Sequence, residues 1–387
     1  MFSSAHRTFI RRTQRIFLAF GAVVFALAAG ELAAALTLGG AFRYGERVSR
    51  SWESSARFDP QYGWSCRPGA RVHVRGEDLD YHVAINSAGF RDPERTLSKP
   101  AGTKRIVLLG DSMTWGWGVD QGQRFSDLLE QKLAPSTQLI NLAVPGYGTD
   151  AHLWTLEERA LAYQPDIILL CFVANDILEA KSSRVHEMFK PRFARSASGE
   201  WDIVDRPLAD PRAFPLRAAS WFRDVVEPRS ALATWLLDRR AALAAAAALR
   251  PLVAIRPNAM QRLETELEDI VRPESVTFML LTRLAAACKQ HAVPLYVVSL
   301  PHCNDPYLYS PALQAPEVGG DGFETSLTAR LRSAGASIGF PVFSIDAAFL
   351  RASRAGETLH TSDFHLNLRG NAVAAEALEP LLSELLR

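Results

Sequence analysis

Ser112 and His365 are the residues of this sequence best suited to nucleophilic chemistry. Ser112 follows the apolar run 106–109 and a Gly-Asp pair, where a buried strand would meet its loop. His365 lies near the C-terminus, two residues after Asp363. A serine hydroxyl becomes a competent nucleophile when a histidine accepts its proton, and a carboxylate can orient that histidine. The three residues therefore predict attack on an ester carbonyl, with Ser112 as nucleophile, His365 as base and Asp363 as orienting acid.

Such an attack also needs hydrogen-bond donors for the oxyanion that forms on the carbonyl. Gly146 follows the apolar run 139–144, and its lack of a side chain lets a backbone N–H approach a ligand closely. Asn175 follows the run 167–173 and offers a side-chain amide. Both are candidate donors. We expect the neighbouring carboxylates, Asp111 and Asp176, to bind loop backbone rather than to react.

The elements that must position these residues form a regular series. Apolar runs alternate with helical patterns, which are 125–133, 151–163, 276–291 and 372–386. The runs are Ile106–Leu109, Leu139–Val144, Ile167–Val173, Leu295–Leu300 and Val342–Ile345. Near-continuous apolar strands between helices indicate a parallel sheet covered on both faces. The sequence therefore predicts an α/β fold, a flavodoxin-like three-layer α/β/α sandwich with a five-stranded parallel sheet.

Two regions lie outside this series. Residues 39–103 are predicted to form an accessory β region. Apolar and polar residues alternate within 71–74 and within 81–85, and turn residues separate the two runs, which predicts a β-hairpin. Residues 178–273 interrupt the series after the third strand and include the alanine-rich run 241–248. The high helix propensity of alanine predicts a helical insertion that could roof the site.

The N-terminus predicts a membrane anchor. Residues 1–15 form a basic tail that contains four arginines, and residues 16–38 are apolar apart from Glu31. At about 1.5 Å per residue this segment could span the roughly 30 Å hydrocarbon core of a bilayer. The arginines should stay in the cytoplasm, which places the rest of the chain on the periplasmic or extracytoplasmic side of the inner membrane. A cleaved signal peptide is the alternative.

Net charge and cysteine spacing bear on nucleic-acid binding, metal binding and disulfide formation. A formal net charge of +1 gives no indication of nucleic-acid binding. The four cysteines show no metal-binding spacing. Cys66 and Cys303 lie in loop-like surroundings and could form a disulfide on the oxidising side of a membrane.

These residues together resemble the SGNH hydrolases, a branch of the GDSL esterase and lipase superfamily named for Ser, Gly, Asn and His in four blocks. The matching blocks of residues 104–387, taken as the hydrolase domain, are Gly110-Asp111-Ser112, Gly146 after Asn141, Asn175-Asp176, and His365 with Asn367 and Gly370. The resemblance implies that the backbone N–H groups of Ser112 and Gly146 form the oxyanion hole with the Asn175 side chain. It also implies that no metal and no cofactor takes part.

The sequence departs from the family pattern at the orienting acid. The usual aspartate stands three residues before the histidine, where this chain has Ser362, whereas Asp363 is two before. This spacing resembles that of membrane-associated SGNH proteins that handle acetyl groups on secreted polysaccharides. Asp346, or a Ser–His dyad without an acid, remains an alternative.

Three hypotheses follow for the function. The first is a membrane-anchored serine esterase that cleaves an acyl ester, in particular an acetyl ester, on a small molecule or glycan. The second is an O-acetyltransferase that passes the acyl group to a cell-surface polysaccharide. One anchor helix cannot carry acetyl across a membrane, so this version needs a multi-span partner or an external donor. The third is a non-catalytic protein of envelope-polysaccharide assembly.

Overall fold

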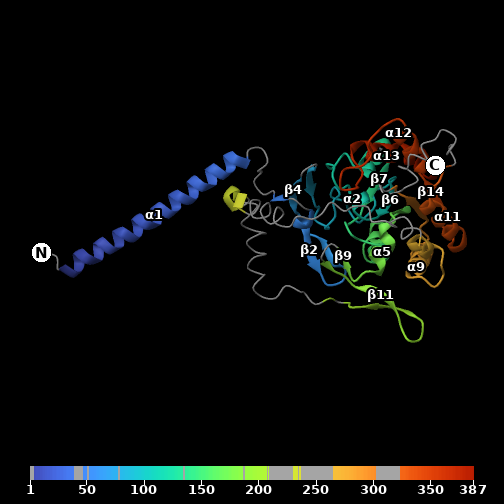
Figure 1. The fold of residues 1–387 in the computed structure, drawn as a ribbon, viewed down its shortest axis with the longest axis horizontal. Helices are drawn as coiled ribbons and strands as arrows, with labels where there is room; N and C mark the ends of the chain where they lie inside the picture. The colour runs from blue at the N-terminus through green and yellow to red at the C-terminus, as the bar shows by residue number, and fades with distance from the viewer. Residues whose placement is uncertain are drawn as a thin grey trace. The chain divides into compact units, whose positions relative to one another are not determined.

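The protein is described by a computed structural model (Figure 1). It describes residues 4–38, 47–49, 52–76, 79–133, 136–185, 188–206, 208, 230–233, 235–236, 265–301 and 323–387. The chain divides into two compact units. One comprises Met1–Ser51 and Pro211–Pro251, and the other Trp52–Asp210 and Leu252–Arg387.

The second unit is built on a five-stranded sheet in the order β14-β13-β8-β6-β7. Its strands are β6 (Lys104–Leu109), β7 (Thr137–Asn141), β8 (Ile167–Phe172), β13 (Leu295–Ser299) and β14 (Val342–Ser344). All neighbouring strands are parallel. In chain order this is the arrangement 2-1-3-4-5, the doubly wound order of flavodoxin-like folds. The predicted parallel sheet is confirmed.

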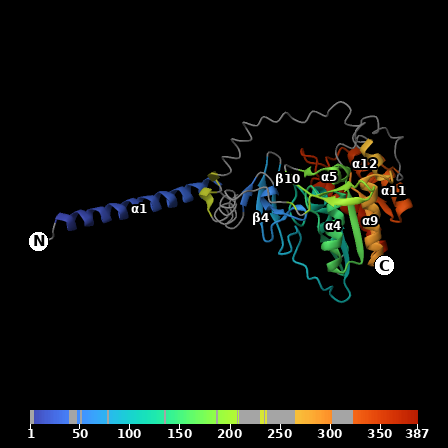
Figure 2. The ribbon, with the colours of Figure 1, turned by 90° about the horizontal axis from the view of Figure 1, so that it is seen from below.

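Successive residues of each strand enter different layers of the core. In β6, Val107 and Leu109 belong to one apolar cluster, and Ile106 and Leu108 to the other. The first cluster is covered by α4 (Thr149–Glu158), α9 (Val276–Gln290) and α11 (Ser326–Ile338), and the second by α3 (Phe125–Leu133), α12 (Asp346–Arg354) and α13 (Leu368–Leu385). Figure 2 shows α4 and α9 side by side over the sheet. The three-layer sandwich is therefore confirmed.

The accessory β region packs onto the first of these layers. Its β4 (Arg71–Arg75) and β5 (Asp80–Ala84) pair antiparallel, which confirms the predicted hairpin, and β2 (Ala56–Asp59) pairs with β3 (Gly63–Cys66). Trp52 and Val83 are buried in the same apolar cluster as the sheet residue Val107. Cys66 is fully buried and its thiol is free, so the predicted disulfide with Cys303, a residue outside the described part of the chain, is wrong.

Residues 184–204 of the insertion contain two β-hairpins, so the prediction of a helical insertion is wrong there, whereas residues 178–181, 231–233, 235–236 and 265–267 are helical. After α5 (Asn175–Lys181), β9 (Arg184–Val185) pairs with β10 (Met188–Phe189), and β11 (Arg192–Arg195) with β12 (Trp201–Val204). Tertiary contacts decide this outcome, because Phe193 alone is buried in β11 and stacks on Trp154 of α4 at 5.8 Å. The alanine-rich run 241–248 lies outside the described residues.

The first unit contains one long helix, α1 (Ser4–Leu38). Within it Leu18–Thr37 is long and apolar enough to cross a membrane, by length and composition. Its charged residue, Glu31, accepts hydrogen bonds from Ser230 Oγ (2.7 Å) and from the backbone N–H of Leu232 (3.2 Å). These contacts satisfy the carboxylate inside an otherwise apolar segment.

Candidate active site

Ser112 is the first residue of a single helical turn, α2 (Ser112–Trp115), at the carboxyl end of β6. Asp111 caps this turn, because its Oδ1 accepts a hydrogen bond from the backbone N–H of Met113 at 2.9 Å. The prediction that Asp111 binds loop backbone is thereby confirmed, as it is for Asp176, whose Oδ2 accepts from the N–H of Val173 at 3.0 Å. The cap fixes Ser112 at the carboxyl end of β6, where the residue is 9% exposed.

The structure brings Ser112, His365 and Asp363 together from opposite ends of the hydrolase domain. His365 Nε2 lies 2.8 Å from Ser112 Oγ, and His365 Nδ1 lies 3.3 Å from Asp363 Oδ1. Asp346, the alternative acid, lies at the start of α12, where its Oδ2 accepts from the N–H of Thr325 at 2.8 Å. Asp363 is therefore the carboxylate beside the imidazole.

The loop that carries His365 is fixed by local hydrogen bonds. Thr361 N–H donates to the carbonyl of His365 at 2.8 Å, and Thr361 Oγ1 donates to Asp363 Oδ1 at 2.5 Å. Phe364 has a φ of +80°, an unusual backbone conformation for a residue with a side chain. Asn367 then caps α13 by accepting from the N–H of Gly370 at 2.9 Å. These contacts hold the imidazole at a fixed angle to α13.

Burial and hydrogen bonding act in opposite directions on Asp363. Partial burial alone would raise its pKa, but hydrogen bonds from His365, Thr361 and Trp117 outweigh burial and lower the pKa below its ordinary value. The carboxyl group is therefore ionised at neutral pH. An ionised group at this position can hold the Nδ1 proton of His365 and leave Nε2 as the acceptor.

Trp117 contacts both members of this pair, whereas an aromatic residue at this position of the sequence suggests core packing or a lining of the acyl site. Its indole Nε1–H donates to Asp363 Oδ2 at 2.5 Å. Its ring stacks on the imidazole of His365, with centroids 4.7 Å apart and planes inclined by 14°. An aromatic residue shortly after a nucleophile block was the only signal in the sequence, because the contact spans 246 residues.

Gly146 lies in the loop after β7, beside the serine loop. The N–H of Val144 donates to the carbonyl of Gly110 at 3.2 Å, which joins the two loops. Gly146 has a φ of +76°, in the left-handed region that favours glycine. The indole N–H of Trp64 donates to the carbonyl of Pro145 at 2.9 Å, so the accessory region also fixes this loop.

Asn175 is the first residue of α5, after β8. Its Nδ2 donates to Asp111 Oδ2 at 2.9 Å, which fixes the amide next to the serine turn. The same side chain also hydrogen-bonds the carboxyl group of Glu179. The structure thus places Asn175 near Ser112 through Asp111.

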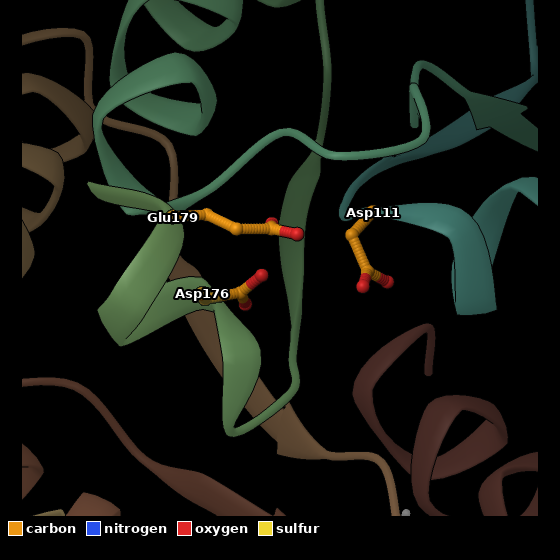
Figure 3. Close-up of side chains that lie close together, drawn as sticks. All are labelled: Asp111, Asp176 and Glu179. Atoms are coloured by element: carbon orange, nitrogen blue, oxygen red, sulfur yellow. The ribbon is translucent and has the colours of Figure 1, made fainter. Parts of the chain in front are cut away.

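Three carboxyl groups lie buried behind the serine turn. Figure 3 shows Asp176 and Glu179 of α5 directed toward Asp111, and the ligand oxygens of the three lie within 4.8 Å of one another. Burial raises the pKa of each group, and the nearby carboxylates raise those of Asp176 and Glu179 further. Oxygen donors in this arrangement suit a hard cation. Protons shared between the three carboxyl groups satisfy these oxygens equally, because the raised pKa values favour protonated, neutral carboxyl groups.

A buried ion pair adjoins this cluster. Lys190, which follows β10, directs its Nζ at Asp150 of α4, with distances of 2.7 Å to Oδ1 and 2.6 Å to Oδ2. The same Nζ donates to the carbonyl of Glu179 at 2.7 Å. Both charged side chains are almost fully buried, at 1% and 0% exposure. The pair therefore joins the insertion to the helices behind the site.

Comparison with known families agrees with this geometry. The model of the GDSL-like lipase/acylhydrolase family matches residues 108–373, which contain every candidate site residue. Among curated proteins no sequence matches significantly.

The solved structures to which the chain is similar are distant in sequence. A member of the lipolytic G-D-S-L family from Veillonella parvula is 12% identical with a TM-score of 0.39, and the match covers 73% of this chain and 99% of that chain. The psychrotrophic esterase EstA from Pseudoalteromonas sp. is 14% identical with a TM-score of 0.37, covering 73% and 98%. A lipase/acylhydrolase from Enterococcus faecalis is 14% identical with a TM-score of 0.37, covering 73% and 97%. On the family match, the chain belongs to the GDSL-like lipase/acylhydrolase family and is a hydrolase that acts on ester bonds.

Proposed function

We propose that the protein is a membrane-anchored serine esterase that cleaves a small acyl ester, in particular an acetyl ester, outside the cytoplasm through an acyl-serine intermediate. The observation that carries the proposal is the hydrogen bond between Ser112 Oγ and His365 Nε2. A hydroxyl at this distance from an oriented imidazole can transfer its proton as it attacks a carbonyl.

In the first half-reaction Ser112 Oγ bonds to the acyl carbon while its proton moves to His365 Nε2. The negative charge that forms on the carbonyl oxygen is stabilised by the N–H groups of Ser112 and Gly146 and by the Asn175 amide. The bond between the acyl carbon and the alcohol oxygen then breaks, and the alcohol leaves with the proton from His365. Asp363 stabilises the imidazolium during this exchange.

In the second half-reaction water replaces the alcohol. His365 accepts a proton from the water as its oxygen bonds to the acyl carbon, and returns a proton to Ser112 Oγ as the acid leaves. If a sugar hydroxyl took the place of water, the same intermediate would give O-acetyl transfer.

The N-terminal segment supports the proposed location, and the Asp363–His365 spacing supports the proposed substrate. Four arginines precede the candidate span Leu18–Thr37, a distribution that favours a cytoplasmic N-terminus and an extracytoplasmic hydrolase unit. The spacing resembles that of SGNH proteins that handle acetyl groups on polysaccharides. The proposed substrate is therefore an acetylated glycan or a similar small ester, and retention of the helix gives the membrane as partner.

The test uses the full chain in detergent micelles with p-nitrophenyl acetate. We expect a burst of p-nitrophenol followed by steady turnover, and loss of both in Ser112→Ala. Ser337→Ala is the matched control, because this serine lies on α11 and bonds only the carbonyl of Ala334 in its own helix. Labelling by a fluorophosphonate should add one adduct at Ser112. The proposal fails if the parent neither hydrolyses nor transfers acetyl, or if Ser112→Ala is as active as the parent.

Addition of an acetyl-accepting oligosaccharide separates hydrolysis from transfer. Acetylated sugar formed at the expense of acetate would identify a transferase, which would then need a multi-span partner to supply acetyl in the cell. Acetate as the sole product supports the esterase. An unlabelled and inactive parent would leave the third hypothesis, a non-catalytic protein of polysaccharide assembly.

A further inference from the structure

Trp117 connects the serine loop to the histidine loop through two different contacts. The indole N–H donates to Asp363 Oδ2, and the indole face covers the imidazole of His365. The Trp117 side chain thus contacts Asp363 through its edge and His365 through its face. These are the two residues proposed to act on Ser112.

Asp363 needs such a contact because of where it lies. It stands two residues from His365, and its side chain is 34% exposed, so water competes for its oxygens. Thr361 donates to Oδ1 and Trp117 donates to Oδ2, which fixes the rotation of the carboxylate. With the rotation fixed, Oδ1 remains directed at Nδ1 of the imidazole. A small misplacement of a catalytic group can cost about 100-fold in rate.

The stacked indole also affects the charge that His365 acquires. When the imidazole accepts the proton of Ser112 it becomes a cation, and the face of an indole attracts a cation more strongly than other aromatic faces do. This attraction is stronger in the transition state, where the imidazole is charged, than in the ground state, so it acts on kcat.

The loop that carries Trp117 is held by a fully buried arginine of the accessory region. Arg91 donates to the carbonyls of Gly116 (2.5 Å) and Val119 (2.6 Å), on either side of Trp117, and its guanidinium lies 4.6 Å from the ring centroid of Trp115. Gly116 has a φ of +86°, and a Cβ there would lie 2.3 Å from the side chain of Arg124. This loop therefore has one tightly specified conformation.

A second contact from the accessory region supports Trp117 directly. Trp52 is buried and packs edge-on against Trp117, with centroids 6.4 Å apart, and against Trp115 at 6.1 Å. The indole of Trp117 is thus confined between Trp52 and His365. Its orientation depends on the accessory region as well as on its own loop.

We propose that Trp117 is a positioning residue that fixes Asp363 and His365 relative to Ser112, and that Arg91 of the accessory β region sets the loop that presents it. This inference rests on the proposed function. It assigns the accessory region a part in the reaction, beyond covering the sheet.

The test begins with Trp117→Phe and Trp117→Leu in the full chain, assayed with p-nitrophenyl acetate. Phenylalanine keeps a stacked ring but has no N–H, and leucine has neither. We expect kcat to fall by about 10-fold for Trp117→Phe and about 100-fold for Trp117→Leu, with KM within about 2-fold of the parent. A rise in KM with unchanged kcat would overturn the proposal, because it would make Trp117 a substrate contact.

A double-mutant cycle tests whether Trp117 acts through Asp363. In the Asp363→Ala background, Trp117→Phe should change kcat by less than about 2-fold, since the carboxylate that it orients is absent. An equal loss in both backgrounds would overturn the positioning role. Fluorescence-detected melting accompanies each variant, and the kcat comparison is made on folded protein.

Arg91→Lys tests the accessory region, with Arg105→Lys as its matched control. Arg105 is also fully buried and donates to the backbone carbonyls of Tyr163 (2.6 Å) and Leu97 (2.9 Å), but it lies at the start of β6, at the opposite end of the strand from Ser112. We expect both variants to melt earlier and only Arg91→Lys to lose kcat, by about 10-fold. Equal kcat in both would overturn the part assigned to Arg91.

Two further results keep the test decisive. If Arg91→Lys does not fold, the Trp117 variants and Arg91→Gln decide the proposal. If the parent neither turns over ester nor takes the fluorophosphonate, the proposed function has failed. If the parent does both and Trp117→Phe matches it in kcat, only the present inference has failed.

Discussion

Asp363 Oδ1 lies 3.3 Å from Nδ1 of His365, and only one residue separates the two along the chain. The side chain of Asn has nearly the shape of Asp363 but no charge, and its amide can turn an N–H toward the imidazole. We therefore expect Asp363→Asn to lower kcat by about 10³- to 10⁴-fold, because the imidazole then adopts the wrong tautomer. Hydrolysis of p-nitrophenyl acetate measures this change.

The control for this variant is Asp346→Asn, which alters the other acid that the sequence had left open. Its carboxylate, at the start of α12, accepts hydrogen bonds from Thr325, the N-cap of α11, so we expect lower stability with kcat retained. The opposite pattern, with Asp363→Asn active and Asp346→Asn inactive, would contradict the assignment of the orienting acid.

Asn175→Ala should lower kcat by about 10²- to 10³-fold, which is the usual cost of removing one oxyanion donor. KM should change little, since the donor acts on charge that develops in the transition state. The same change leaves Asp111 Oδ2 without the bond from Nδ2, so thermal stability should fall as well. Kinetics on folded protein distinguish the two effects, and a variant with unchanged kcat would exclude Asn175 from the oxyanion hole.

Lys190→Met should destabilise the protein by about 3–5 kcal/mol, because it leaves the buried carboxylate of Asp150 without its partner. Urea unfolding followed by tryptophan fluorescence measures the change in the free energy of unfolding. The double variant with Asp150→Asn is the control, since it removes the uncompensated charge and should recover most of the loss. A double variant as unstable as Lys190→Met would show that packing of the lysine stem, rather than charge, is responsible.

The carboxyl cluster predicts that stability falls as pH rises. Burial and the nearby Asp111 raise the pKa of Glu179 from 4.5 to about 8 in the folded state. Between these values the folded protein holds a proton that the unfolded chain releases, so stability present below pH 4.5 is lost progressively toward pH 8. Glu179→Gln cannot release this proton, so its stability relative to the parent should increase over that range.

Urea unfolding of both proteins at pH 5 and pH 8 measures this linkage. Glu376→Gln serves as the control, because this residue is exposed on α13, and its pH dependence should match that of the parent. If Glu179→Gln gained no stability over the parent on going from pH 5 to pH 8, the carboxyl group would be ionised throughout, as it would be beside a bound cation.

Much of the fold was predictable because its signals are local. The strands containing Val107 and Leu170 are continuous apolar runs, and their ends carry the polar residues that parallel topology brings to one edge. Ser112 and His365 meet although 253 residues separate them, and His365 lies beyond α12 rather than at the end of a strand. The order of the blocks that resemble the SGNH family indicated this pair.

The remaining features depend on pairings that leave no local pattern. Trp117 and Asp363 are 246 residues apart, and neither residue's type predicts a contact with the other. The strands of the insertion's hairpins are only two to four residues long, and Lys190 reaches Asp150 only because the tertiary structure brings them together. The alanine-rich run 241–248 favours helix for the insertion, but residues 184–204 contain only two alanines.

The apolar core that Trp52 and Val83 share with Val107 bears on how this sequence can change over evolution. A substitution in the accessory strands that moves Arg91 alters the backbone on either side of Trp117, and with it the angle of His365. Substitutions in the accessory strands must therefore be accompanied by compatible substitutions in the loop that carries Trp117. A chimaera that takes its accessory strands from a relative would also need that relative's residues 115–119 to retain turnover.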